Sequence, residues 1–224
     1  AGIRDPLWSR GLGDVYKRQS RRVDRVGVRV DDEVAARLAS YVELLERWNR
    51  RMNLTALHDD ESGLDRLIVE PLVAARYLPD VGRLTDIGSG GGSPAIPLGL
   101  FRPGLQIRLV ESKTRKTAFL REAIRRLKID RALVEETRYE ELLTRTQLHE
   151  SQEVITVRAV RVDAGVLRSL QALLVPGGIV ALFRSSSSGN DLDGVQPPLV
   201  WEATYPLVES QRSELVVMRK LNIV

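Results

Sequence analysis

From Arg83 to the C-terminus, short apolar runs alternate with longer stretches of helical periodicity. The apolar runs, which we expect to be strands, span residues 83–87, 106–110, 132–135, 153–157 and 178–183. The helical stretches between them lie at about 94–101, 114–127 and 162–174. Two later runs, about 200–207 and 214–219, are joined by a polar turn and predict an antiparallel hairpin. We therefore expect an α/β fold with a Rossmann-like, mostly parallel sheet, helices on both of its faces and a C-terminal antiparallel hairpin.

The first 80 residues have a different organisation. Asp31 or Asp32 can cap a helix whose apolar side chains recur every three or four residues, and a second helical stretch runs from about Leu64 to Tyr77. The apolar side chains of the first helix are Val34, Leu38, Val42, Leu45 and Trp48. Residues 1–19 have neither helical nor strand periodicity and resemble a foreign leader. We expect a leader over residues 1–30, a helical extension over 31–80 and the main α/β domain over 81–224.

Composition excludes several classes of protein. A chain of 224 residues can bury one substantial core, but two full domains are not expected. No apolar run approaches the roughly 18 residues that cross a bilayer, so we expect no membrane partner. The chain has no cysteine, and its only histidines are His58 and His149, which argues against a metal site. A reducing cytoplasm suits this composition, and we expect a cytoplasmic monomer.

A glycine-rich turn follows the first strand of the main domain. The run from Asp86 to Gly92 reads Asp-Ile-Gly-Ser-Gly-Gly-Gly, and Pro94 then suits the first position of a helix. Glycine accepts positive φ and lets a ligand approach the backbone closely. Ligands of parallel sheets bind at the carboxyl ends of the strands, so this turn is the expected binding site.

Two carboxylates decide which ligand the turn suits. A dinucleotide fingerprint requires G-x-G-x-x-G, whereas Ser93 stands in the last position here. Asp86 would repel a pyrophosphate, but it would favour the sulfonium and ammonium groups of S-adenosylmethionine. Glu111 ends the next strand, where its two oxygens can accept both hydroxyls of a ribose. Since NAD enzymes share such an acid, a nicotinamide-dependent oxidoreductase remains the alternative that uses the same turn.

Five segments carry a family resemblance. They are W-N-R-R-M-N-L-T at 48–55, D-I-G-S-G-G-G-S-P-A-I-P-L at 86–98, L-V-E-S-K-T-R-K-T-A-F-L at 109–120, R-Y-E-E at 138–141 and V-R-A-V at 157–160. The chain resembles the bacterial 16S ribosomal RNA guanine-N7 methyltransferase family, also called glucose-inhibited division protein B, from about residue 33 onward. The resemblance implies a class I methyltransferase fold with an N-terminal helical extension, S-adenosyl-L-methionine as cofactor, and 16S ribosomal RNA or the small ribosomal subunit as partner.

The resemblance also implies cofactor contacts at Gly88, Ser93, Tyr139, Glu140 and Arg158. Together with the residues singled out above, the expected cofactor-binding set is Asp86, Gly88, Gly90, Ser93, Glu111, Tyr139, Glu140 and Arg158. The stretch that begins at Arg138 follows the third strand, where an adenine could lie against Tyr139. Arg158 is the one expected catalytic residue, as a contact that positions the target base or a phosphate.

Methylation of guanine N7 needs little chemistry from the protein. The N7 lone pair is free at neutral pH, so the reaction needs an in-line approach to the methyl group and no general base. The chain has no cysteine and no obvious nucleophile, which fits that requirement. The product guanine is cationic, and a carboxylate such as Glu140 could stabilise the developing charge.

A basic cluster lies between residues 108 and 131. Its members are Arg108, Lys113, Arg115, Lys116, Arg121, Arg125, Arg126, Lys128 and Arg131, against Glu111, Glu122 and Asp130. Such a cluster could neutralise RNA phosphates, and the alternative is a solvated helix face. The expected RNA contacts are Arg115, Lys116, Arg121 and Arg125.

The chain departs from the family pattern at three places. Leu67-Ile68-Val69-Glu70-Pro71 stands where the family has His-x-x-Asp-Ser, and Phe183-Arg184 stands where it has Lys-Gly after the fifth strand. In the glycine turn, Ser93 replaces an apolar residue and Ala95 replaces a glycine. These segments border the expected mouth of the site, so a non-catalytic relative that still binds RNA or cofactor is a second alternative.

Overall fold

The computed structural model describes residues 22–23, 25–52, 54, 61–186 and 195–222. Of the leader predicted over residues 1–30, the structure describes residues 22–23 and 25–30, and the foreign-looking segment over residues 1–19 lies outside the described residues. Among the described helices, none is both long and apolar enough to cross a membrane.

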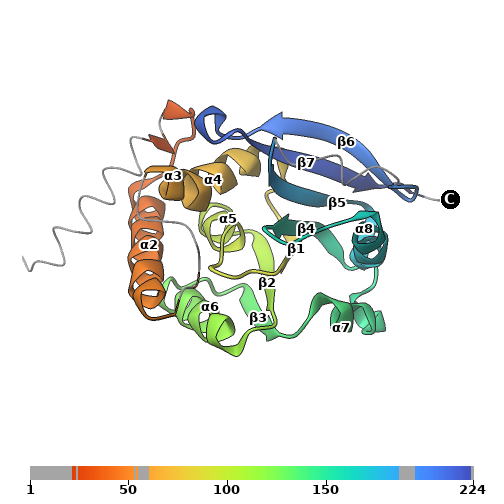
Figure 1. Cartoon of the computed structure of the whole chain (residues 1–224), viewed down its shortest axis with the longest axis horizontal. Coiled ribbons are helices and arrows are strands. Elements are labelled where there is room, and N and C mark those ends of the chain that lie inside the picture. The colour runs from red at the N-terminus through yellow and green to blue at the C-terminus, as the bar shows by residue number, and fades with distance from the viewer. Residues whose placement is uncertain (1–21, 24, 53, 55–60, 187–194, 223–224) are drawn as a thin grey trace, which may run out of the picture.

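A seven-stranded sheet forms the centre of the molecule (Figure 1). Its strands are β1 (Gly82–Ile87), β2 (Leu105–Glu111), β3 (Ala132–Glu136), β4 (Gln152–Arg158), β5 (Leu174–Ser185), β6 (Leu199–Pro206) and β7 (Ser213–Lys220). Their order is β3-β2-β1-β4-β5-β7-β6, and the first five pair in parallel. β7 runs antiparallel to both β5 and β6. The predicted strands, and the hairpin at the end of the chain, are confirmed.

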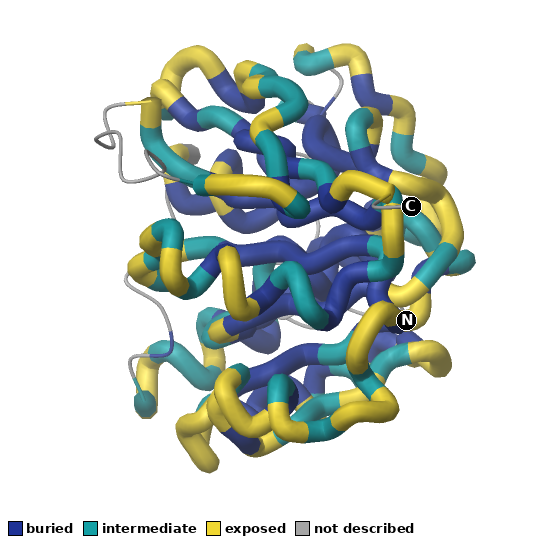
Figure 2. Tube along the Cα trace, turned by 90° about the vertical axis from the view of Figure 1, so that its right-hand side faces the viewer, coloured by how far each residue is buried: buried dark blue, intermediate teal, exposed yellow. Residues whose placement is uncertain are grey.

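Helices cover both faces of the sheet. On one face lie α2 (Asp32–Met52), α5 (Ala95–Phe101) and α6 (Thr114–Arg126), and their buried side chains share one core with those of β1, β2 and β4. On the other face lie α7 (Tyr139–Leu143) and α8 (Ala164–Leu170), whose core includes Ile155 and Val157. Single 3₁₀ turns occur at η3 (Thr146–Leu148), η4 (Gln171–Leu173) and η5 (Glu209–Gln211). Figure 2 shows the buried residues concentrated along the strands between these helical layers.

The helix α2 begins where its cap was expected. The side chain of Asp31 accepts a hydrogen bond of 2.8 Å from the amide of Val34. Leu38, Val42 and Leu45 of the predicted stripe are buried, and α2 packs against both α5 and α6. The helical extension therefore shares its core with the sheet.

The second helical stretch, expected from about Leu64 to Tyr77, combines three kinds of helix. It comprises α3 (Glu61–Leu64), a π-helical turn η1 (Asp65–Val69), α4 (Glu70–Ala74) and a 3₁₀ turn η2 (Ala75–Tyr77). In the π turn, the amide of Glu70 bonds to the carbonyl of Asp65, five residues earlier. Pro71 follows and has no N–H to donate. The predicted helical stretch is thus confirmed, but it is interrupted by a π turn in which two backbone carbonyls lose their α-helical donors.

Candidate functional site

The glycine loop, residues 88–92, connects the carboxyl end of β1 to α5. Gly88, Gly90 and Gly92 have φ values of +71°, +49° and +91°, which favour glycine. A Cβ atom built on Gly88 would overlap the side chain of Val160, and one built on Gly92 would overlap Ile96. The loop is therefore shaped by close packing on both sides, and neither glycine can be replaced without a shift.

A cavity of about 230 Å³, here called the loop cavity, opens beside the glycine loop at the ends of β1 and β2. Its lining includes Gly88, Glu111, Thr137, Tyr139, Glu140 and Val160. Gly88, Glu111, Tyr139 and Glu140 are four of the residues expected to bind the cofactor. Asp86, Gly90, Ser93 and Arg158 were also expected there, but they do not line this cavity.

Glu111 is fixed at the rim of the loop cavity by backbone amides. One carboxylate oxygen accepts from the amide of Gly90 at 3.1 Å, and the other accepts from the amide of Lys113 at 2.9 Å. Gly90 thus contacts the acid that was expected to bind the ribose. Each oxygen keeps a lone pair for a further donor, so a diol could still bind there.

Tyr139 and Glu140 form the opposite wall. They begin α7, directly after β3, as the sequence predicted. Tyr139 is half-buried, and burial together with the adjacent Glu140 raises the pKa of its phenol. The neutral ring is suited to lie against an aromatic ligand.

Asp86 is buried beneath the glycine loop, with 1% of its surface exposed. One of its carboxylate oxygens accepts from the hydroxyl of Thr156 at 2.7 Å, and the other has no hydrogen-bond partner among the described residues. Burial raises the pKa of Asp86 to about 7. A buried carboxylate oxygen without a partner is costly, and a cationic ligand is one group that would offset the cost.

Tyr41, from the helical extension, also reaches the glycine loop. Its hydroxyl donates to the carbonyl of Gly91 at 2.6 Å, and the side chain is fully buried. This contact was not predicted, because a tyrosine next to the apolar stripe of an amphipathic helix is ordinarily a core residue. Nothing in its spacing indicates a partner 50 residues away.

Arg158 and Ser93 contact the irregular turn that precedes α4. Arg158 forms an ion pair with Glu70 and donates to the carbonyl of Arg66 at 2.5 Å and to Ser93 Oγ at 3.1 Å. Ser93 Oγ in turn donates to the carbonyl of Leu67 at 2.9 Å. Burial, followed by the nearby Arg66, lowers the pKa of Arg158 to about 10. The two residues thus belong to a polar network between β4 and α4.

A second cavity, the Arg158 cavity, has a volume of about 280 Å³. Its lining includes Arg66, Glu70, Arg158, Val160, Phe183 and Arg184. Val160 lines both cavities, so the two are adjacent. In the sequence, Glu70 was singled out only as part of the segment that replaces the family's His-x-x-Asp-Ser motif. Glu70 stands where that motif has its aspartate, and this match was the signal that could have identified it as a site residue.

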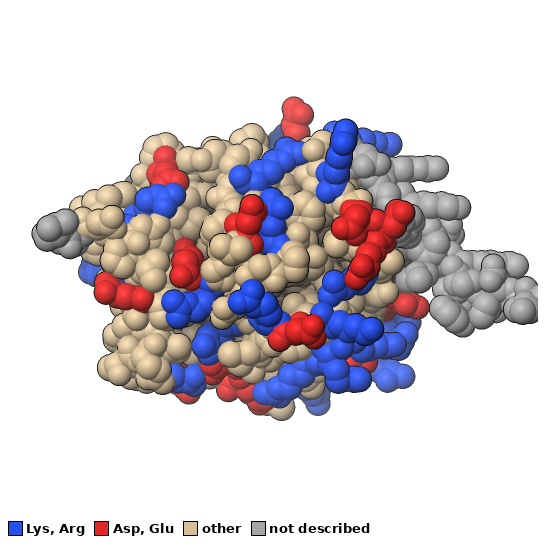
Figure 3. All heavy atoms as spheres, turned by 180° about the vertical axis from the view of Figure 1, so that it is seen from behind, with Lys and Arg blue, Asp and Glu red and all other residues tan. Residues whose placement is uncertain are grey.

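The four expected RNA contacts lie on α6 and differ in their surroundings. Arg115, Arg121 and Arg125 are exposed, and Arg121 forms an ion pair of 3.1 Å with Glu136. Lys116 is half-buried, and its ammonium lies 3.9 Å from where a Cβ of Gly90 would be. Figure 3, which shows the face opposite to that in Figure 1, has Lys and Arg side chains gathered at its lower right. A basic surface therefore extends away from the glycine loop.

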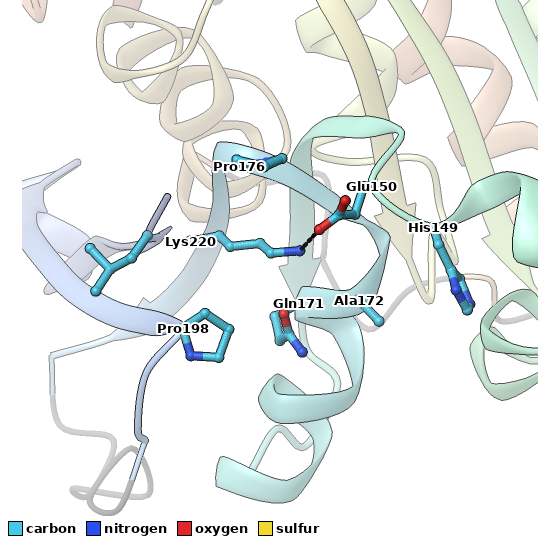
Figure 4. Close-up of a pocket in the computed structure, with 8 residues that line it drawn as sticks. His149, Glu150, Gln171, Ala172, Pro176, Pro198 and Lys220 are labelled. Carbon is cyan, nitrogen blue, oxygen red and sulfur yellow. Dashed lines mark hydrogen bonds and ion pairs between the residues drawn. The ribbon is translucent and has the colours of Figure 1, made fainter. Parts of the chain in front are cut away.

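A larger hollow, about 550 Å³, lies at the other end of the sheet (Figure 4). Glu150 and Gln171 line it just before β4 and β5 begin, and Lys220 lines it at the end of β7. Lys220 donates to Glu150 at 2.8 Å and to the carbonyl of Leu174 at 2.9 Å. These are the amino ends of the parallel strands, away from the glycine loop. No group of His, Asp and Glu suited to hold a metal occurs among the described residues.

Comparison with known proteins agrees with this geometry. Residues 34–203 match the GidB family, described as rRNA small subunit methyltransferase G. The chain is 35% identical over 195 residues to the ribosomal RNA small subunit methyltransferase G of Xanthomonas oryzae pv. oryzae, covering 85% of this chain and 89% of that one. It is 40% identical over 155 residues to the protein of the same name from Stenotrophomonas maltophilia, covering 69% of this chain and 71% of that one.

The structure of a precorrin-6y C5,15-methyltransferase from Geobacter metallireducens superposes with a TM-score of 0.52 at 13% identity, over 75% of this chain and 92% of that one. At this identity the likeness concerns the fold alone, which is that of a class I methyltransferase. The chain belongs to the rRNA small subunit methyltransferase G family.

Proposed function

We propose that the protein transfers a methyl group from S-adenosyl-L-methionine to guanine N7 of small-subunit ribosomal RNA. The observation that carries the proposal is the loop cavity, which has a ribose-binding acid, an aromatic wall and a buried, half-satisfied carboxylate close by. The names of the curated relatives supply the RNA substrate.

The residues around the glycine loop fit this cofactor. Glu111 would accept the ribose hydroxyls, and the adenine would lie against Tyr139 and Glu140. Gly88 and Gly90 would let the cofactor approach the backbone, and Asp86 would favour its cationic end. The cofactor supplies an electrophilic methyl group bound to a sulfonium. The dinucleotide alternative is disfavoured because a pyrophosphate at the glycine loop would lie close to the buried carboxylate of Asp86.

The chain's own side chains would orient the reactants. Guanine N7 is an unprotonated nucleophile, so no side chain has to remove a proton. Arg158 lines the second cavity, where it could hold the target nucleotide, and Ser93 would support it from the loop side. Glu140, which was expected to stabilise the cationic product, lines the loop cavity and not the Arg158 cavity.

The basic surface of α6 would bind the RNA backbone. Arg115, Arg121 and Arg125 are exposed there, and Lys116 lies between them and the glycine loop. We propose 16S ribosomal RNA or the small subunit as the partner of a monomeric, cytoplasmic enzyme. Residues 81–224 would form the cofactor domain, residues 31–80 the helical extension and residues 1–30 a leader.

Two measurements test the proposal. Calorimetric titration with S-adenosylhomocysteine should show binding on the order of micromolar, and NADH should not compete. Transfer of labelled methyl groups to small subunits that lack the modification should yield N7-methylguanosine on digestion. Binding without transfer would favour the non-catalytic alternative, and NADH binding in its place would favour the oxidoreductase.

A further inference from the structure

Arg158 is held at the boundary of the two cavities by acceptors of different kinds. The carboxylate of Glu70, the carbonyl of Arg66 and the hydroxyl of Ser93 all accept from its two terminal nitrogens. The side chain is only 16% exposed. An arginine that attracted a ligand only by its charge would not need three acceptors to fix its terminal nitrogens.

The backbone before α4 is arranged to supply one of these acceptors. Because the amide of Glu70 bonds to Asp65, it does not bond to the carbonyl of Arg66 as in an α-helix. Pro71 has no N–H that could do so instead. The carbonyl of Arg66 is therefore left for Arg158, which donates to it at 2.5 Å. π-Helical turns of this kind are frequent at functional sites.

Glu70 is a buried acid with one partner. Its side chain is 3% exposed, one oxygen contacts Arg158, and the other has no hydrogen-bond partner among the described residues. A buried ion pair of this kind is a poor source of stability, since a well-packed apolar pair commonly does as well. The benefit of the Glu70–Arg158 ion pair is then the orientation that it gives to one of its two side chains.

Arg158 still has donors to offer. No described residue accepts from its Nε, and the nitrogen that contacts Glu70 has a second hydrogen. Arg158 and Phe183 line the same cavity, with the guanidinium 5.3 Å from the ring centre. The remaining donors are therefore available to carbonyl or phosphate oxygens of a nucleotide in that cavity.

We infer that Glu70 is a positioning residue, which fixes the guanidinium of Arg158 for the target nucleotide and does not itself touch the nucleotide. The inference rests on the proposed function. It assigns the helical extension a part in the reaction through Arg158, because Glu70 and Arg66 both belong to that extension. It also predicts that Glu70 acts only through Arg158.

A double-mutant cycle tests this prediction. Glu70→Gln should lower kcat/KM for methyl transfer by roughly 10- to 100-fold, mostly in kcat, because a small misplacement of a positioning group has such an effect. Arg158→Ala should lower it at least as much. In the Arg158→Ala background, Glu70→Gln should change the rate by less than about twofold. Glu202→Gln, which removes the Arg219 ion pair on β6 and β7, is the matched control and should leave the rate unchanged.

Two readouts separate orientation from a general loss of structure. Arg158→Ala leaves a buried carboxylate unpaired, so it should melt at a lower temperature than the double variant. Glu70→Asp keeps the charge and should recover part of the rate lost in Glu70→Gln. If Arg158→Ala does not fold, Arg158→Lys takes its place in the cycle, since it keeps the charge without the planar fork.

Rate losses that multiply in the double variant would overturn the inference, because Glu70 would then act independently of Arg158. A wild-type protein that transfers no methyl group would instead overturn the proposed function. The same cycle, measured as affinity for small-subunit RNA, then decides on Glu70. Losses that do not add would support coupling through Arg158, and losses that add would overturn it.

Discussion

Replacing Asp86 by asparagine should stabilise the free protein while it weakens cofactor binding. The folded-state pKa of Asp86 is raised by burial from 3.8 to about 7. A folded pKa above the unfolded value means that the folded protein retains a proton that the unfolded chain releases. The contribution to stability is then complete below about pH 4 and is lost as the pH rises towards 7.

The size of this effect follows from the shift. About three pKa units at about 1.4 kcal/mol each amount to roughly 4 kcal/mol at pH 8. Asparagine removes this term and can still accept the hydrogen bond from Thr156, but its buried amide nitrogen would lack an acceptor, at about 1–3 kcal/mol. The net gain at pH 8 is about 1–3 kcal/mol, or roughly 2–12 °C in melting temperature for a chain of this size.

Binding should change in the opposite direction. The α-ammonium group of S-adenosylhomocysteine favours ionised Asp86, so the affinity of the wild type for this ligand should rise about tenfold between pH 6 and pH 8. The Asp86→Asn variant should bind roughly 10- to 100-fold more weakly at pH 8, without that pH dependence. Thermal unfolding at pH 5 and pH 8, together with calorimetry at pH 6 and pH 8, measures both effects.

An exposed aspartate serves as the control. Asp130→Asn should alter neither the melting temperature nor the affinity, because Asp130 lies outside both cavities. If the melting temperature of Asp86→Asn at pH 8 is equal to or lower than that of the wild type, the free-energy cost assigned to the buried charge is refuted. Equal wild-type affinities at pH 6 and pH 8 would refute its role towards the cofactor.

Three further changes test the loop and the basic surface. Tyr41→Phe removes the hydrogen bond to the glycine loop and should weaken S-adenosylhomocysteine binding about 3- to 10-fold by calorimetry, with an unchanged circular dichroism spectrum. Gly88→Ala places a Cβ against Val160 at a positive φ, so it should abolish detectable binding and lower the free energy of unfolding by about 1–3 kcal/mol in denaturant titration. Replacing Arg115 and Arg125 together by glutamine should reduce, by about two, the slope of the logarithm of RNA affinity against the logarithm of salt concentration. An unchanged slope would mean that the two arginines belong to a solvated helix face that does not bind RNA.

The sequence predicted the sheet and the place of the loop cavity for the same reason. Apolar runs bounded by turn residues are a local signal, and parallel strands bring their carboxyl ends to one edge. Gly88, Glu111 and Tyr139 each follow or end a strand, so their meeting required no knowledge of side-chain packing. The alternation of strands and helices predicted a site at this edge, whereas the cofactor contacts at Gly88 and Tyr139 were implied by the family resemblance.

Contacts between distant segments could not be predicted in this way. Tyr41 bonds to a residue 50 positions away, and Glu70 pairs with one 88 positions away. Both partners depend on how α2 and α4 pack on the sheet, which helical periodicity does not specify. The π turn at Asp65–Val69 likewise depends on hydrogen bonds that leave no pattern in the spacing of apolar residues.

The helical extension and the glycine loop therefore form one site despite their separation in sequence. A loop of glycines has almost no side chains with which to hold its own shape, so neighbouring elements must impose it. Tyr41 holds the carbonyl of Gly91, and the carbonyl of Leu67 accepts from Ser93 at the other end of the loop. Each contact joins one side chain to one backbone carbonyl, and in each case one of the two residues lies before β1. A boundary at residue 81 thus separates two segments of the chain, whereas the geometry of the glycine loop depends on both.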